Sequence, residues 1–173
     1  QEGYVRGRTF LHPQLGVSFT VPDRFVIDNT AAAVTAAGPG DIAVRFDAVS
    51  IDSRVTLSDY LRSGWVAGLE PGSIRPVTIN GNEAVSARAR ADDWHFDITV
   101  IRAGGQVYRL LTAAPAGSSA LETVAGQVRA SFNTLSDAEK ANLRPLRVRV
   151  VAVEPGQTVA TLAARMEGID RKL

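Results

Sequence analysis

Side chains that commonly bind divalent metal ions recur at alternate positions in the middle of the chain. Asp93, His95 and Asp97 alternate there with apolar residues. Because successive side chains of a β-strand point to opposite faces, these three would project from one face together. Carboxylate and imidazole groups suit a divalent cation. The same alternation is also typical of a solvated strand face beside a turn. We expect a solvated face. The alternative is that the three side chains form a metal site.

The two histidines of the chain lack the spacing that hydrolytic zinc sites need. A zinc peptidase places two histidines one helical turn apart, with a carboxylate that activates the metal-bound water. His12 and His95 are far apart in the sequence, and His12-Pro13 predicts a loop. Cysteine is absent, and neither a Gly-x-Ser-x-Gly nor a Walker-type sequence occurs. The sequence therefore predicts no catalytic residue, no cofactor and a chain that is not an enzyme.

Three residues elsewhere are candidates for binding. Arg147 and Arg149 would point to the same side of a predicted strand, where they could contact an anionic glycan or a neighbouring protein domain. Trp65 could line a ligand site. The competing interpretations are a solvated strand face for the two arginines and ordinary core packing for the tryptophan.

Composition excludes two classes of function. A net charge of +1 and an aromatic content of 6% argue against a nucleic-acid-binding surface, which needs clustered basic residues and stacking rings. No apolar run reaches the roughly 18 residues that a membrane span requires. A hydrophobic content of 45% over 173 residues permits one well-packed core with a small appendage.

Alternating apolar and polar residues predict strands along most of the chain. The predicted strands are 17–21, 25–28, 32–37, 42–48, 74–79, 83–91, 94–100, 107–113 and 146–153. Asn80-Gly81 predicts a tight hairpin, because both central positions of a type I′ turn need a positive φ. Reversals at Asp92-Asp93 and Gly104-Gly105 follow, so the strands from 74 to 113 should form an antiparallel meander.

Helices are predicted where a capping residue precedes apolar residues at helical spacing. They are 57–69 behind Thr56, about 121–132 behind a capping box of Ser119 and Glu122, about 138–143 behind one of Ser136 and Glu139, and a final helix from Thr158. Runs of strands with two packed helices predict the α+β class with an antiparallel sheet. We expect a lead-in at 1–8, an α+β sandwich domain at 9–135, and a linker helix with a strand-helix extension at 136–173.

The C-terminal part of the sequence resembles half of a known module. Residues 151–159 read Val-Ala-Val-Glu-Pro-Gly-Gln-Thr-Val and are followed by Leu162-Ala163 and Met166. This pattern resembles the opening half of a LysM module, a small unit that binds N-acetylglucosamine polymers. The resemblance implies peptidoglycan as a ligand.

A wider resemblance spans nearly the whole chain. It rests on Gly3-Tyr4-Val5-Arg6-Gly7-Arg8, Phe10-Leu11-His12-Pro13 and Leu15-Gly16, then Val44-Arg45-Phe46-Asp47-Ala48-Val49, and Leu143-Arg144-Pro145-Leu146-Arg147-Val148 before the LysM-like end. In this order the residues resemble the non-catalytic region that follows the catalytic domain in bacterial zinc metallopeptidases of the HtpX and BepA type. The resemblance implies a periplasmic or envelope location, with zinc held in a catalytic domain outside this sequence. The partners that the resemblance implies are this catalytic domain and, beyond it, envelope protein substrates or peptidoglycan.

The opening at 16–25 and the meander also resemble the Mog1/PsbP-like sandwich, a likeness of fold. We therefore predict a non-catalytic accessory domain of an exported metallopeptidase, which positions a substrate, a partner or cell-wall glycan. The alternatives are a free-standing periplasmic binding protein with the Mog1/PsbP-like fold, and a peptidoglycan-binding module of the LysM type.

Overall fold

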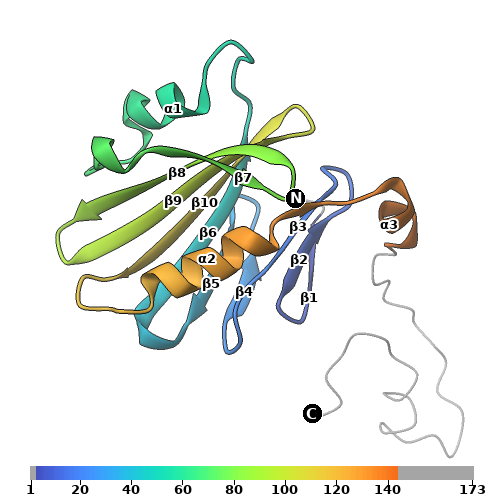
Figure 1. Ribbon diagram of the computed structural model, residues 1–173. Coiled ribbons are helices and arrows are strands. Elements are labelled where there is room, and N and C mark those ends of the chain that lie inside the picture. Colours follow the sequence, from blue (N-terminus) through green and yellow to red (C-terminus); the bar gives the residue numbers. More distant parts are fainter. Residues whose placement is uncertain (1–2, 144–173) are drawn as a thin grey trace, which may run out of the picture.

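Two antiparallel sheets and few helices make up residues 3–143, the part of the chain that our computed structural model describes (Figure 1). The larger sheet has the order β4 (Val26–Asn29), β5 (Val34–Gly38), β6 (Ile42–Val49), β10 (Gln106–Pro115), β9 (Trp94–Ala103), β8 (Asn82–Ala91) and β7 (Arg75–Ile79). The smaller sheet has the order β1 (Tyr4–Arg6), β2 (Thr9–His12), β3 (Val17–Thr20) and β11 (Asn133–Thr134). The predicted extension with Arg147 and Arg149 lies outside the described residues.

The predicted meander is confirmed. Strands β7 to β10 are neighbours in sequence order, and each pairs antiparallel with the next. The first hairpin turns at Asn80 and Gly81, whose φ values of 46° and 81° are those of a type I′ turn. The last turns at Gly104 and Gly105, also with positive φ. Local turn chemistry therefore sets the register of the four strands that build most of the larger sheet.

The smaller sheet was not foreseen from the sequence. Residues 4–6, expected to be a lead-in, form β1 and pair with β2, and Asn133 and Thr134 return beside β3. The protein is consequently richer in sheet than the predicted α+β description. No helix within residues 3–143 has the length and apolar character to cross a bilayer.

Helices are few and short among the described residues. They are α1 (Leu57–Tyr60), the π-helical turn η2 (Leu61–Trp65), α2 (Leu121–Ser131), α3 (Asp137–Asn142) and the single turns η1 (Pro39–Asp41) and η3 (Pro71–Ser73). Thr56 caps α1 as predicted, because its hydroxyl accepts a hydrogen bond from the backbone of Asp59. The predicted helix over 57–69 is wrong beyond Trp65, since Gly64 takes a φ of 95° and ends the helical turn.

The two predicted capping boxes had different outcomes. Ser136 and Glu139 form theirs at the start of α3, with both reciprocal hydrogen bonds present. The box at Ser119 and Glu122 is wrong, because Ala120 holds the N-cap position of α2 and no side chain caps it. The Ser118 hydroxyl instead accepts a hydrogen bond from the Ala120 backbone. The loop into α2 turns one residue later than the sequence pattern indicates.

Both faces of the larger sheet carry apolar clusters. On one face, α2 and the smaller sheet cover a cluster that includes Phe19, Phe46, Tyr108 and Phe132, whose rings contact one another. On the other face, Leu57 and Leu61 of the α1–η2 segment pack on strands β8 and β9. Figure 1 shows α2 crossing the first face. Alternation along each strand thus divides its side chains between two separately covered faces.

Candidate functional site

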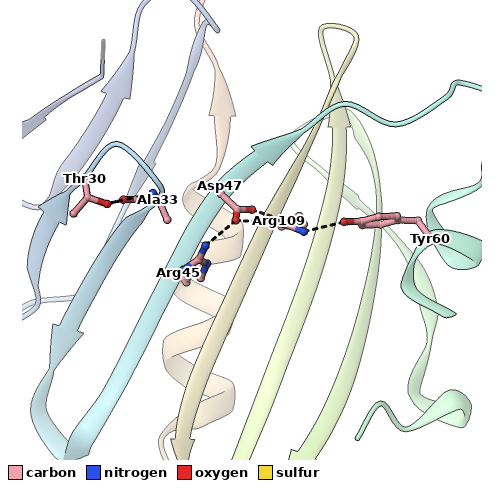
Figure 2. Close-up of polar contacts among 6 residues, drawn as sticks. All are labelled: Thr30, Ala33, Arg45, Asp47, Tyr60 and Arg109. Atoms are coloured by element: carbon pink, nitrogen blue, oxygen red, sulfur yellow. Dashed lines mark hydrogen bonds and ion pairs between the residues drawn. The ribbon is translucent and has the colours of Figure 1, made fainter. Parts of the chain in front are cut away.

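Trp65, a predicted binding residue, covers a buried guanidinium group. The Arg109 guanidinium of β10 lies 4.5 Å from the centre of the Trp65 ring, and Tyr60 stacks beside that ring. Arg109 also donates a hydrogen bond of 2.9 Å to the Tyr60 hydroxyl (Figure 2). Asp47, on the neighbouring strand β6, accepts two bonds of 2.6 Å from the same guanidinium (Figure 2).

The ion pair at the centre of this cluster is largely buried. Asp47 and Arg109 keep only 9% and 16% of their side-chain surface exposed. Hydrogen bonds from Arg109 to Asp47 raise the pKa of the guanidinium, with Tyr60 and the Asp47 charge adding to the effect and burial opposing it. Trp65 therefore joins the α1–η2 segment to the sheet through its contacts with Arg109 and Tyr60.

The candidate metal residues Asp93, His95 and Asp97 occupy different surroundings. Asp93 lies in the exposed turn before β9, whereas His95 and Asp97 lie within that strand. The expected solvated face is wrong for Asp97, which is 9% exposed because α2 covers this part of the sheet. Its carboxylate accepts a hydrogen bond of 3.2 Å from Arg129 of α2. Within residues 3–143, no three His, Asp or Glu side chains gather into a group that could hold a metal ion.

Asp97 instead lines a groove between α2 and the edge of the larger sheet. Two hollows of about 520 and 220 Å³ adjoin there, since both are lined by Arg88 and Asp97. We call them together the β8–α2 groove. The larger hollow is lined by Glu70, Gly72, Ser73, Arg75, Ser86, Ala87, Arg88 and Asp97. The smaller is lined by Arg88, His95, Asp97, Ser118, Ser119, Leu121 and Glu122.

The walls of the groove are held by contacts between distant segments. The Asn80 side chain, in the β7–β8 turn, donates hydrogen bonds to the carbonyls of Ala130 and Phe132 at the end of α2. The Ser131 hydroxyl bonds the backbone of Thr20, which ties the same end of α2 to the smaller sheet. Helix α2 is therefore fixed against both sheets while the groove beside it stays open.

Most charged residues that line the groove are paired, two of them with arginines that lie outside the lining. Arg88 contacts Glu122, Arg90 contacts Glu70, and Arg129 contacts Asp97. Arg75, on the edge strand β7, has no carboxylate within 4.0 Å among the described residues. Polar groups in a concave site fix the orientation of a ligand through directed hydrogen bonds. The groove therefore offers one unpaired cation beside a buried carboxylate.

Burial raises the pKa of the Asp97 carboxyl, while the charges of Arg129, Arg88 and Arg75 act to lower it. The folded chain therefore binds this proton more tightly than the unfolded chain does. The stabilisation from Asp97 is full below the unfolded pKa of about 4 and is lost as the pH rises through the folded pKa.

We predict that the Asp97→Asn variant lacks this pH dependence. Relative to it, the native chain should lose free energy of unfolding as the pH is raised from below about 4 through the folded pKa. Urea unfolding of both proteins across that range measures the difference. If the difference in free energy of unfolding between the two proteins stays constant, or changes in favour of the native chain as the pH rises, the pKa of Asp97 is not raised.

His12 lies at the end of a strand, whereas several groove residues have no counterpart among the predicted site residues. His12 is the last residue of β2 and is buried, and its Nδ1 accepts a hydrogen bond from the Leu15 backbone, so the predicted loop begins after it. Sequence reasoning missed Arg75, Ser86 and Arg88. The available signal was the alternation of side chains along these strands. It places the three residues on one face of the β7–β8 hairpin, the same face on which Asp97 projects from the neighbouring strand.

Comparisons with known proteins show likeness of fold. No family model matches the chain, and no curated protein matches it significantly. A crystal structure from Bacteroides thetaiotaomicron matches 78% of this chain with 14% identity and a TM-score of 0.58, and this chain covers 51% of that protein. The solution structure of cyanobacterial PsbP (CyanoP) from Synechocystis matches 76% of this chain, and 94% of CyanoP, with the same identity and TM-score. The predicted PsbP-like fold is thus supported, and the chain spans about half of the Bacteroides protein.

Proposed function

We propose that this chain is a non-catalytic binding domain of an exported bacterial zinc metallopeptidase, and that its β8–α2 groove holds polypeptide for a catalytic domain elsewhere in the protein. The groove is the observation that carries the proposal, because it joins an open volume of about 520 Å³, lined by polar side chains from three strands, to a smaller hollow bordered by α2. The PsbP-like fold is in keeping with a binding or accessory role.

The sequence resemblance is the basis for proposing a metallopeptidase as the full-length protein. The ordered motifs from Gly3 to Val148 resemble the region that follows the catalytic domain of HtpX- and BepA-type peptidases. In this proposal, zinc and the water-activating glutamate belong to that other domain, and this chain contributes substrate position. A domain that raises the local concentration of substrate lowers KM without taking part in the chemistry.

The first measurement is to read the coding sequence upstream of Gln1. We expect a signal peptide and an HExxH motif. The isolated chain, supplied with zinc, should not cleave casein. Metal-dependent cleavage by the purified chain would contradict its non-catalytic role.

We predict that filling the groove weakens substrate binding. Ser119 is exposed and lines the smaller hollow, so Ser119→Trp should obstruct the groove with little effect on the fold. In the full-length peptidase this variant should raise KM for casein several-fold and leave the zinc content unchanged. Ser53→Trp, in an exposed loop before α1, is the matched control. Equal KM values for the two variants would show that substrate does not use the groove.

A second candidate function rests on the LysM-like pattern at 151–159, which favours cell-wall glycan as a ligand. The test is co-sedimentation with insoluble peptidoglycan, using the chain and a version that ends before Arg147. Loss of co-sedimentation in the shorter version would support this function. Unchanged or absent co-sedimentation would exclude it.

A further inference from the structure

The larger hollow of the β8–α2 groove is lined by an arginine, Arg75, that has no carboxylate within 4.0 Å among the described residues. Arg75 of β7 lies opposite Ser86 of β8 in the hairpin register, so the two side chains project from the same face. Both line the larger hollow. An arginine guanidinium presents a planar fork of donors, which matches a carboxylate or a phosphate with two parallel hydrogen bonds. The hollow therefore contains a ready anion donor at its edge.

Ser86 provides a second donor at the base of the hollow. The residue is 3% exposed, and its hydroxyl oxygen accepts a hydrogen bond of 3.1 Å from Arg129. Among the described residues none accepts a hydrogen bond from this hydroxyl. A serine hydroxyl can donate one bond while it accepts others, so its proton remains available to a ligand. A buried donor of this kind gains free energy when a ligand oxygen satisfies it.

The charges around the hollow fix the sign and size of the ligand charge. Arg88 is matched by Glu122, Arg129 by Asp97 and Arg90 by Glu70. Arg90 and Arg129 lie outside the lining but pair with the lining carboxylates Glu70 and Asp97. With these pairs counted, Arg75 is left over as an excess of one positive charge. A monoanion balances that excess, whereas a dianion would add repulsion from the Asp97 and Glu70 carboxylates that line the same hollow.

We propose that the larger hollow binds the carboxylate of an acidic side chain in a polypeptide, with Arg75 as the two-pronged donor and the Ser86 hydroxyl as the second donor. This inference rests on the proposed binding function and names the chemistry that the groove selects. The residues that flank the acidic side chain extend toward the smaller hollow, which shares Arg88 and Asp97 with the larger. The domain would thereby favour acidic segments of a protein substrate.

The test compares two labelled peptides that differ in one group. The probes are acetyl-Ser-Val-Glu-Val-Ser-amide and the same peptide with glutamine in place of glutamate, titrated with the whole chain by fluorescence anisotropy. The glutamate peptide should bind about tenfold more tightly, as expected for one charge-assisted bidentate contact. Arg75→Gln should abolish this preference. Arg62→Gln, an exposed arginine of η2 outside the groove lining, is the matched control and should retain it.

The first of the remaining outcomes separates the carboxylate inference from the proposed binding function, and the others contradict the inference. If both peptides bind equally and Ser119→Trp weakens both, the groove binds polypeptide but the carboxylate inference is wrong. If the glutamate preference persists in Arg75→Gln, the assigned donor is wrong and the inference fails. Displacement of the glutamate peptide by inorganic phosphate at a lower concentration than by acetate would show a preference for phosphate over a carboxylate and would also overturn it. Absence of binding by either peptide contradicts the inference directly.

Discussion

Replacement of Asp47 by asparagine is expected to lower the free energy of unfolding by about 3 kcal/mol, because it leaves a largely buried guanidinium without its counter-charge. Asparagine keeps the shape of aspartate, so the packing of β6 changes little. Arg109 would retain its hydrogen bond to the Tyr60 hydroxyl and its contact with the Trp65 ring. Neither replaces the negative charge that accepts both of its 2.6 Å bonds.

Asp52 and Arg54 provide a matched control for the Asp47 variant. They also form a pair with two hydrogen bonds, of 3.0 and 2.7 Å, but the Arg54 side chain is 88% exposed. Water screens such a surface pair. Urea denaturation of Asp52→Asn should therefore give an unchanged midpoint. Similar losses in the two variants would show that the environment of the Asp47–Arg109 pair does not set its contribution. Loosening of the α1–η2 segment should accompany only the Asp47 variant, and solvent quenching of Trp65 fluorescence measures it when the exposed Trp94 is replaced by phenylalanine in both proteins.

The Gly68→Ala variant is expected to lose at least about 2 kcal/mol of stability, from backbone strain together with lost hydrogen bonds. Gly68 has a φ of 71°, and a Cβ built there would lie 1.9 Å from the Arg90 carbonyl oxygen. Strand β7 pairs with β8 only as far as Ser86. Beyond that point, Gly68 and Glu70 border β8 through backbone bonds with Arg90 and Arg88 of 3.0 and 2.9 Å. The added methyl group must displace the backbone at Gly68 from β8.

Gly105→Ala separates conformational strain from the close approach. Gly105 has a similar φ of 78°, but a Cβ there would meet no atom within 4 Å. That variant should lose only about 1 kcal/mol, the cost of a left-handed alanine. Thermal unfolding measures both, and hydrogen exchange at the Arg90 and Glu70 amides should accelerate in the Gly68 variant alone. Equal losses in the two variants would mean that the segment at Gly68 moves aside without cost. Because Glu70 and Ser73 line the larger hollow, the same variant should also weaken binding in the groove.

One hairpin contributes both to the lining of the groove and to the position of α2. The hairpin β7–β8 supplies both the donor Arg75 and the tie from Asn80 to α2. Ligand contact and helix position thus depend on the same two strands. A substrate segment held there would gain effective concentration near a linked catalytic site. This role needs a rigid groove, and the hydrogen bonds of Asn80 and Ser131, which fix the C-terminal end of α2 to the two sheets, favour one.

The amino-acid sequence by itself determined the local structure of this protein. The hairpins at Asn80-Gly81 and Gly104-Gly105, the Thr56 cap and the capping box at Ser136 were predictable because turn and cap chemistry depends on a few adjacent residues. Alternation along the strands also indicated which side chains share a face.

Only the tertiary structure decided what covers each face. The alternation that grouped His95 with Asp97 could not show that α2 buries Asp97 and pairs it with Arg129. The contact between Asp47 and Arg109 joins residues 62 positions apart, and the smaller sheet joins β3 to β11 across the whole domain. Such contacts arise from the packing of distant segments, which local residue spacing does not encode. The groove exists for the same reason: its walls come from elements far apart in the chain and become neighbours only when α2 lies on the sheet.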